Sequence, residues 1–150
     1  MTLIIRNVSA EDRLAWDALW QGYLVFYEHP LTSEQTDLTW SRLLDEEFAL
    51  KGLVAELDGA MVGIAHYCPT YSTWEPNPDL YLEDLFVDAS VRGTGIGRAL
   101  INGVAEIAAG IGSSKIFWQT HKNNVVARRL YDSIGELSEF VTYLKKTETP

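Results

Sequence analysis

The chain has 150 residues, which predicts a single domain over residues 1–150 with a core large enough to fold without a disulfide or a metal. Apolar residues make up 47% and charged residues 22%, a composition that argues against disordered, collagen-like and coiled-coil chains. Twelve basic and 21 acidic residues give a net charge of −9, which disfavours nucleic acid as a partner and mildly favours cationic molecules.

The sequence also disfavours a membrane protein and a disulfide or redox site. No apolar run reaches the roughly 18 residues of a membrane span, and Met1–Asn7 is too short and too polar for a signal peptide. We therefore expect a cytoplasmic protein with no membrane partner. Cys68 is the single cysteine, which excludes an internal disulfide and a CxxC motif, and its apolar surroundings favour a packed thiol over a nucleophile.

The first half of the chain predicts a strand, two helices and a hairpin. The strand covers residues 3–6, and Ser9 begins a helix that His29-Pro30 ends. The apolar residues of that helix recur at helical spacing: Trp16, Leu19, Trp20, Tyr23, Phe26 and Tyr27. Thr32 starts a second helix, which is expected to end at Lys51-Gly52 and to turn three residues towards the core: Leu43, Leu44 and Phe48. Strands over 53–57 and 61–67 then flank the turn Asp58-Gly59.

The second half predicts alternating strands and helices. After a loop over 70–79 come a strand at 80–87, a helix that Gly110 and Gly112 end, a strand at 115–120, a helix at 123–134 and a strand at 139–145. The order β-α-α-β-β-β-α-β-α-β predicts an α/β fold (α+β, mixed sheet) with helices on the faces of the sheet.

A glycine-rich run, Arg92-Gly93-Thr94-Gly95-Ile96-Gly97, lies between an expected strand and an expected helix. Glycines there let successive backbone N–H groups converge on one point, and a helix N-terminus adds partial positive charge. The run therefore predicts a phosphate cradle, to which Arg92 and Arg98 would add full charges. Arg98-Ala99 stands where a dinucleotide fingerprint needs glycine and a P-loop needs Gly-Lys, so neither motif fits. The alternative is a tight turn with no ligand.

Two motifs resemble one family. The pattern Arg92-x-x-Gly95-x-Gly97 after Leu85-Phe86-Val87 resembles the acetyl-coenzyme A (acetyl-CoA) signature of the GNAT N-acetyltransferases. Residues 81–97 are similar to diamine (spermidine/spermine) acetyltransferases, and residues 118–131 resemble yeast-type amino-acid and histone acetyltransferases. The resemblance covers roughly residues 80–135. It implies the GNAT acyl-CoA N-acyltransferase fold and an enzyme that transfers acetyl from acetyl-CoA to a primary amine, by direct attack in a ternary complex and without a metal.

The resemblance also assigns the cofactor contacts. The pantetheine arm would pair with the backbone of Leu85, Phe86 and Val87, and Asn124 would hydrogen-bond it. The pyrophosphate would contact the loop: Arg92, Gly93, Thr94, Gly95, Ile96, Gly97 and Arg98. Ala127 and Tyr131 share a helix face with Asn124, and the Tyr131 hydroxyl would protonate the departing thiolate. A backbone N–H near Val87 would polarise the thioester carbonyl.

Glu83 and Asp84 are the candidates for handling the amine. Adjacent residues of a strand point to opposite faces, so both can line one pocket only if the strand bulges. The resemblance gives Glu83 the role of a water-linked base and both residues a role in substrate binding. The alternative is that one or both are solvated or paired with an arginine such as Arg92.

For the residues at the end of the first helix, a binding role and a structural role explain the sequence equally well. Tyr27 and Glu28 would bind the acceptor at the end of the first helix, with Tyr23 and Trp74 nearby, although core packing and plain surface exposure explain them as well. His66 and His121 show no metal-ligand spacing and are interpreted as structural.

The sequence leaves the acceptor open. It could be a polyamine, an amino acid or a lysine side chain on a peptide, and an aminoglycoside is a further alternative. The alternative that is not an enzyme is a catalytically silent CoA-binding regulatory module. The presence of Tyr131 and Glu83 argues against it. Gly135-Glu136 replaces the family's usual Gly-Phe. The resemblance also predicts a homodimer through Phe140-Val141-Thr142-Tyr143.

Overall fold

A computed structural model describes residues 1–149 and divides the chain into two compact units, Met1–Gln119 and the residues from Thr120 onward. Whether both units form the single domain expected from the length stays a prediction. No helix of the described residues is long and apolar enough to cross a membrane.

The first unit is built on a five-stranded sheet in the order β1-β2-β3-β4-β5. Its strands are β1 (Leu3–Asn7), β2 (Lys51–Leu57), β3 (Ala60–Thr70), β4 (Asp79–Val87) and β5 (Ile116–Trp118). Neighbours from β1 to β4 are antiparallel, whereas β5 is parallel to β4. This mixed sheet confirms the predicted fold class.

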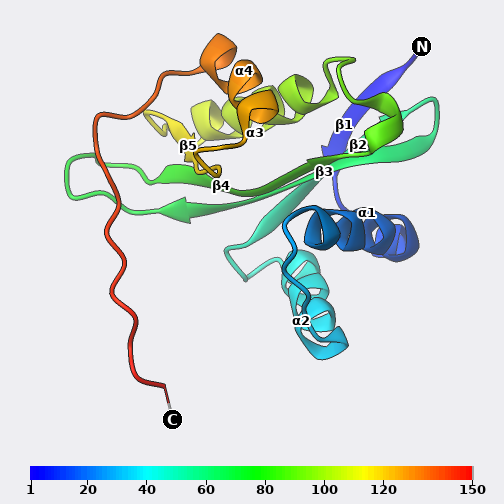
Figure 1. The fold of residues 1–150 in the computed structure, drawn as a ribbon, viewed down its shortest axis with the longest axis horizontal. Coiled ribbons are helices and arrows are strands. Elements are labelled where there is room, and N and C mark those ends of the chain that lie inside the picture. Colours follow the sequence, from blue (N-terminus) through cyan, green and yellow to red (C-terminus); the bar gives the residue numbers. More distant parts are fainter. Residues whose placement is uncertain (150) are drawn as a thin grey trace. The chain divides into compact units, whose positions relative to one another are not determined.

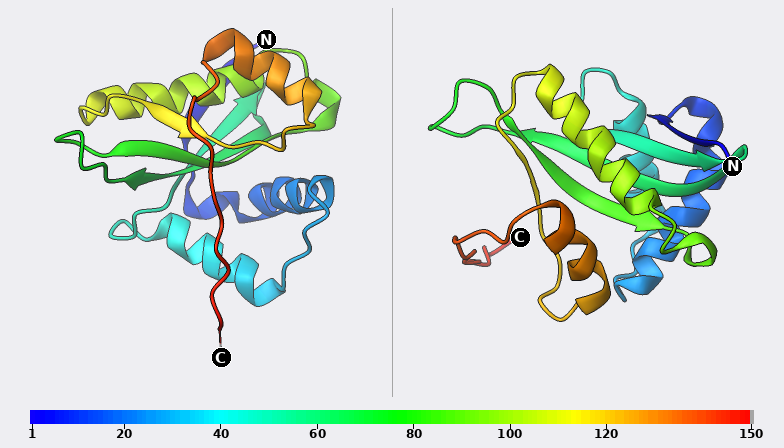
Figure 2. Two further views of the ribbon diagram at one scale, coloured as in Figure 1. Left: turned by 60° about the vertical axis from the view of Figure 1, so that its left-hand side comes forward. Right: turned by 90° about the horizontal axis from the view of Figure 1, so that it is seen from above.

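Helices cover both faces of the sheet. The helices α1 (Arg13–Phe26) and α2 (Ser33–Leu44) lie on one face, and α3 (Ile96–Gly110) lies on the other (Figures 1 and 2). Short 3₁₀ turns at Ala10–Asp12 and Ala89–Val91 precede α1 and α3.

Local sequence explains where these helices begin and end. Ser9 and Asp12 form a capping box ahead of α1, and the Thr32 hydroxyl accepts a hydrogen bond from the backbone N–H of Gln35 at 3.1 Å. α1 ends at Phe26, two residues earlier than the sequence suggested, because Glu28 turns the chain with a left-handed φ of 51°.

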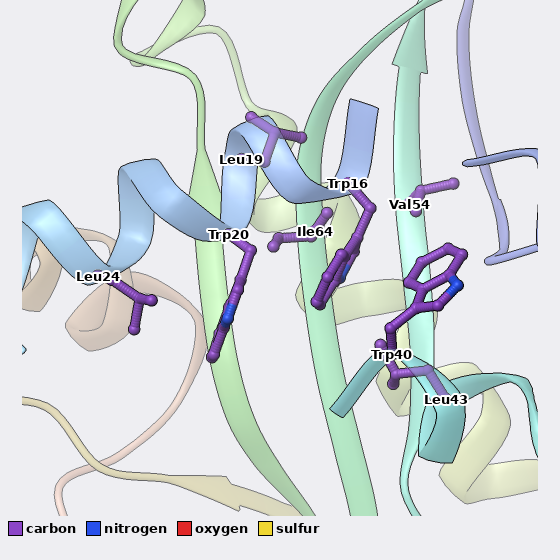
Figure 3. Packing of buried hydrophobic residues seen from close by; sticks show 8 residues of the cluster. All are labelled: Trp16, Leu19, Trp20, Leu24, Trp40, Leu43, Val54 and Ile64. Carbon is purple, nitrogen blue, oxygen red and sulfur yellow. The ribbon is translucent and has the colours of Figure 1, made fainter. Parts of the chain in front are cut away.

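The core between α1, α2 and the sheet is aromatic. Figure 3 shows Trp16, Trp20 and Trp40 packed over Val54 and Ile64, with leucines around them. An added Cβ at Gly22 of α1 would stand 2.9 Å from the Phe86 ring, so glycine is what lets the helix approach β4 this closely. The core therefore fixes α1 over β3 and β4.

Two details of the second-helix prediction are wrong. α2 ends at Leu44, and Lys51-Gly52 begins β2 instead of ending a helix. Leu43 is buried as expected, but Leu44 and Phe48 are exposed. The apolar period was extended past the true helix end at Asp45, where the backbone becomes extended, so Phe48 is carried away from the helical face.

The second unit contains α4 (Val125–Ile134) and an extended tail. The strand expected over 139–145 is wrong for this structure, since that segment joins no ladder within residues 1–149. Its β-prone side chains are exposed, with Phe140 at 77% and Tyr143 at 91%. A strand requires a neighbour with which to exchange hydrogen bonds, and composition alone does not supply one.

Candidate active site

The strand β4 and the edge strand β5 part from each other halfway along β4. β5 pairs with β4 only over Leu80, Tyr81 and Leu82. The remainder of β4 continues to Val87 with β3 on its other side, so β5 leaves the edge at 83–87 uncovered. This edge contains the backbone of Leu85, Phe86 and Val87, where an extended ligand could add main-chain hydrogen bonds.

A β-bulge lies at the point of divergence. On β3, His66 is paired with Asp84 and the next residue, Tyr67, is paired with Leu82, which leaves Glu83 as the extra residue of β4. A bulge of this kind interrupts the strict alternation of side chains. Because the strand bulges here, Glu83 and Asp84 can line the same pocket although they are adjacent in sequence.

Asp84 is the centre of a hydrogen-bond network that the sequence did not reveal. Its Oδ2 lies 2.9 Å from His66 Nδ1, and its charge also acts on the Tyr23 hydroxyl. The other ring nitrogen of His66, Nε2, accepts from Trp16 Nε1 at 3.0 Å. His66 is buried, as a structural histidine would be, yet it contacts a candidate site carboxylate. The contact between His66 and Asp84 depends on the register of β3 against β4, which the sequence does not give.

A row of aromatic rings, stacked except for the tilted last pair, leads to this carboxylate. The ring centroids of Trp16 and Trp20 are 5.8 Å apart, those of Trp20 and Tyr23 are 5.0 Å apart, and those of Tyr23 and Tyr27 are 4.7 Å apart. Burial and the charge of Asp84 raise the pKa of Tyr23, so its hydroxyl stays protonated and remains a donor. Trp16 and Trp20 are buried, so Tyr23 and Tyr27 at the outer end of the row are the rings suited to contact a cationic group.

Glu83 has a different environment from Asp84. The residue is exposed, whereas the Asp84 side chain is only 14% exposed. Partial desolvation of the carboxyl, and then the charge of Asp84, raise the pKa of Glu83 above its usual value. Two neighbouring carboxyls with different affinities for a proton can divide the work of anchoring an amine and accepting its proton.

The glycine loop has the geometry of an anion cradle. Gly93 and Gly95 adopt left-handed φ values of 82° and 89°, and Gly95 is the N-cap of α3. An added Cβ at either glycine would meet no atom within 4 Å, so the space in front of the loop is open. The first backbone N–H groups of α3 point out of the helix into this region.

Arg92 is held in place beside the loop. Its Nε donates to the carbonyl oxygen of Val87 at 2.9 Å, and its guanidinium stacks over Phe26 and Phe86 at 5.5 and 5.2 Å from the ring centroids. The contact of Arg92 with a cofactor stays a prediction, as does that of Arg98 and the other loop residues.

The second unit carries the remaining predicted residues. Asn124 is the N-cap of α4, where its Oδ1 accepts from the backbone N–H of Ala127 and its Nδ2 donates to Thr120 Oγ1, both at 3.3 Å. Ala127 and Tyr131 are one helical turn apart on α4, so they share a face. Their roles are not tested by this geometry.

The peripheral candidates are exposed. Tyr27 is 40% exposed and Trp74 is 82% exposed, and Glu28 lies on the surface. Burial and the charges of Glu83 and Asp84 raise the pKa of Cys68, so this half-buried thiol stays protonated near neutral pH, in accord with a packed residue. Within residues 1–149, no group of three or more His, Cys, Asp or Glu is arranged to hold a metal ion.

Comparison with known proteins decides the family. The model of the acetyltransferase (GNAT) family matches residues 15–135, which is most of the chain and spans both units. The chain belongs to the GNAT family. It is an N-acetyltransferase that acts on an amine, as the resemblance in its sequence implied.

Curated GNAT relatives act on small amines. The chain is 29% identical over 143 residues to the D-amino-acid N-acetyltransferase HPA3 of Saccharomyces cerevisiae, an alignment that covers 94% of this chain and 89% of that protein. It is 39% identical over 75 residues to the thialysine N-epsilon-acetyltransferase of Bos taurus, covering 50% of this chain and 44% of the bovine protein. These two relatives match the yeast-type and diamine-type features expected from the sequence.

Solved GNAT structures share the fold at lower identity. A ribosomal-protein-alanine N-acetyltransferase from Brucella melitensis superposes with a TM-score of 0.83 at 22% identity, covering 97% of this chain and all of the other. The aminoglycoside acetyltransferase AAC(6')-Iy, in complex with a bisubstrate analogue of CoA, gives 0.84 at 21%, covering 98% and 99%. At these identities the likeness establishes the fold alone.

Proposed function

We propose that this enzyme transfers an acetyl group from acetyl-CoA to the primary amine of a small, positively charged molecule, by direct attack in a ternary complex. The observation that carries the proposal is the bulge at Glu83. It brings two carboxylates to the point where β4 parts from β5, beside the open strand edge.

The residues of the first unit suit acetyl-CoA. The open edge at Leu85, Phe86 and Val87 offers backbone groups to the amides of a pantetheine arm. The loop from Gly93 to Arg98 offers backbone N–H groups to a pyrophosphate, in a space that a Cβ at Gly93 or Gly95 would fill. When bound, acetyl-CoA supplies the activated thioester.

Asp84 and Glu83 have separate roles in handling the amine. Asp84 accepts a hydrogen bond from His66 and holds the ammonium form by its charge. Glu83, with its raised pKa, takes the proton directly or through water, since only the neutral amine has the lone pair needed for attack. The amine nitrogen then bonds to the acetyl carbon while the carbon–sulfur bond breaks, and the surplus proton on the nitrogen is released to solvent, from which the tyrosine that protonates the thiolate regains its own proton.

Two further groups complete the proposed reaction. A backbone N–H near Val87 stabilises the negative charge that develops on the carbonyl oxygen. The Tyr131 hydroxyl donates a proton to the departing thiolate, a role supported by the family's motif and by the stripe that Tyr131 forms with Ala127. Asn124 donates to the pantetheine arm.

The acceptor is proposed to be an amino acid or a related diamine. The relatives are named for D-amino acids, thialysine and L-ornithine, all small molecules with a primary amine. An aromatic row beside two carboxylates binds a cation of that size, and the net charge of −9 favours its approach. Tyr27 and Glu28 would contact the part of the acceptor farthest from the reacting nitrogen.

The test is thiol release from acetyl-CoA with a panel of amines: D- and L-amino acids, thialysine, ornithine, spermidine, an aminoglycoside and a basic peptide. Asp84→Asn is expected to raise KM for the amine, and Glu83→Gln to lower kcat. Glu106→Gln, an exposed carboxylate on α3 on the opposite face of the sheet, is the matched control and should leave both constants unchanged. No thiol release with any amine, or an equal loss of activity in all three variants, would refute the proposal.

We also propose that the two units form one domain and that the enzyme is a homodimer through its C-terminal tail. The family model spans both units, and the tail exposes a cluster of large apolar side chains: Leu137, Phe140, Val141, Tyr143 and Leu144. Sedimentation should give the mass of a dimer, and Phe140→Ser together with Val141→Ser should give a monomer. A monomeric wild-type protein would refute this assembly.

A further inference from the structure

A buried chain of three side chains runs from the aromatic core to the amine site. Trp16 Nε1 donates to His66 Nε2 at 3.0 Å, and His66 Nδ1 lies 2.9 Å from Asp84 Oδ2. Both Trp16 and the His66 side chain are 1% exposed. The three residues come from α1, β3 and β4, which are far apart in sequence.

The chain of hydrogen bonds fixes the position of the proton on His66. The indole N–H of Trp16 can only donate, so Nε2 of His66 must present its lone pair. In a neutral imidazole the proton is then on Nδ1, which donates it to the Asp84 carboxylate. A proton on Nε2 would place two donors against each other, with Trp16 unpaired in the core.

Asp84 consequently has one fixed donor and free capacity. His66 from β3 gives its carboxylate a hydrogen bond, and a carboxylate can accept about four. The Tyr23 hydroxyl from α1 interacts with the same carboxylate. The other titratable groups around it are Glu83 and Tyr81 on β4 and Cys68 on β3. None of these three is a cation, so a positive charge that Asp84 attracts must come from outside this group.

We propose that His66 is a positioning residue for the amine acceptor: held as its Nδ1–H tautomer by Trp16, it orients the Asp84 carboxylate towards the substrate's ammonium group. This inference rests on the proposed function, because it assigns the acceptor side of that same site. Trp16 acts indirectly, because it holds the His66 ring in the orientation that contacts Asp84.

Two substitutions of His66 separate its two contacts. In asparagine the amide nitrogen reaches the place of Nδ1, so His66→Asn keeps a donor to Asp84 but loses Trp16. In glutamine the side-chain end reaches the place of Nε2, so His66→Gln keeps an acceptor for Trp16 but loses Asp84. We expect His66→Gln to raise KM for the amine about 10- to 100-fold, the range for a lost charge-assisted hydrogen bond, with KM for acetyl-CoA unchanged. His66→Asn should raise KM for the amine much less.

A double-mutant cycle tests whether His66 acts through Asp84. In an Asp84→Asn background, His66→Gln should change KM for the amine no further, because the group it orients has lost its charge. Trp40→Phe is the packing control, since Trp40 contacts Trp16 in the same core but its ring is not among those packed on His66. It should lower stability and leave KM for the amine unchanged. Equal effects of His66→Asn and His66→Gln, or additive effects in the cycle, would overturn the proposal.

A second measurement does not depend on turnover. Nitrogen-15 chemical shifts of the His66 ring, assigned by the loss of its signals in His66→Gln, report the tautomer directly. We expect the Nδ1–H tautomer and a changed spectrum in Asp84→Asn and Trp16→Phe. The Nε2–H form would overturn the inference. An inactive protein that shows the Nδ1–H form would overturn the proposed function and leave the hydrogen-bond assignment standing.

Discussion

Replacing Gly95 by alanine separates the two explanations of the glycine loop, a tight turn or a phosphate cradle. Gly95 has a φ of 89°, where an alanine costs about 1–2 kcal/mol of backbone strain. The added Cβ would clash with nothing within 4 Å, so no packing penalty is added. For a chain of this length we expect the melting temperature to fall by about 2–8 °C.

Gly59 provides the matched control. It lies in the turn between β2 and β3 with a φ of 84°, and an added Cβ there also meets nothing within 4 Å. Gly59→Ala should therefore cost the same stability as Gly95→Ala. Only the Cβ at Gly95 would occupy the space in front of the N-terminus of α3, so only that variant should bind acetyl-CoA more weakly.

The expected size of that loss follows from the contacts at stake. Displacing a phosphate oxygen from one backbone N–H removes a charge-assisted hydrogen bond, which corresponds to about a 10- to 100-fold rise in Kd. Scanning calorimetry gives the melting temperatures, and titration calorimetry with CoA gives the affinities. If both variants lose stability equally and bind CoA like the wild type, the glycines serve the turn alone and the cradle is refuted.

Three other predictions address protonation, stability and capping. Acetyl transfer should fall as the pH is lowered through the raised pKa of Glu83, and Glu83→Gln should lose this acid limb in a profile of kcat/KM; an unchanged limb would exclude Glu83 as the base. Arg6 donates to both carboxylate oxygens of Asp12 and lowers its pKa, so Arg6→Met should cost about 1.5–3 kcal/mol in urea unfolding at neutral pH. Since a depressed pKa stabilises the fold only while the carboxyl is ionised, this difference should shrink as the pH falls through the pKa of Asp12, and a constant difference would contradict the assignment. Asn124→Ala should destabilise α4 by about 1 kcal/mol through the lost cap, whereas Asn124→Asp should not, as followed by circular dichroism; equal melting of both would argue against the cap.

Features that depend on neighbouring residues were predictable from the sequence. The caps at Ser9 and Thr32 and the turn at Asp58-Gly59 are local choices of side chain and backbone, and the structure has all three. The glycine loop was recognisable for the same reason. Its three glycines stand where the chain passes from a strand to a helix.

Features that depend on strand register were not predictable. The bulge at Glu83 exists only because β3 and β4 pair one residue out of step at His66, and that offset is set by packing over the whole sheet. His66 was interpreted as structural because nothing in its own stretch of sequence indicates Asp84, which is 18 residues away. The expected last strand failed in a similar way, since the pattern at 139–145 carries no information about a partner.

Arg92 would join the two proposed binding steps, that of the cofactor and that of the acceptor. Its side chain touches Phe26 at the end of α1, Phe86 on β4 and the carbonyl of Val87 next to the glycine loop. A ligand that draws the guanidinium towards the loop must alter its stacking on α1, the helix whose tyrosines we propose for the acceptor site. Thermodynamic linkage makes that influence reciprocal, so an acceptor that shifts the end of α1 would change the affinity for the cofactor by the same factor. The two proposed substrates would then bind cooperatively through one arginine.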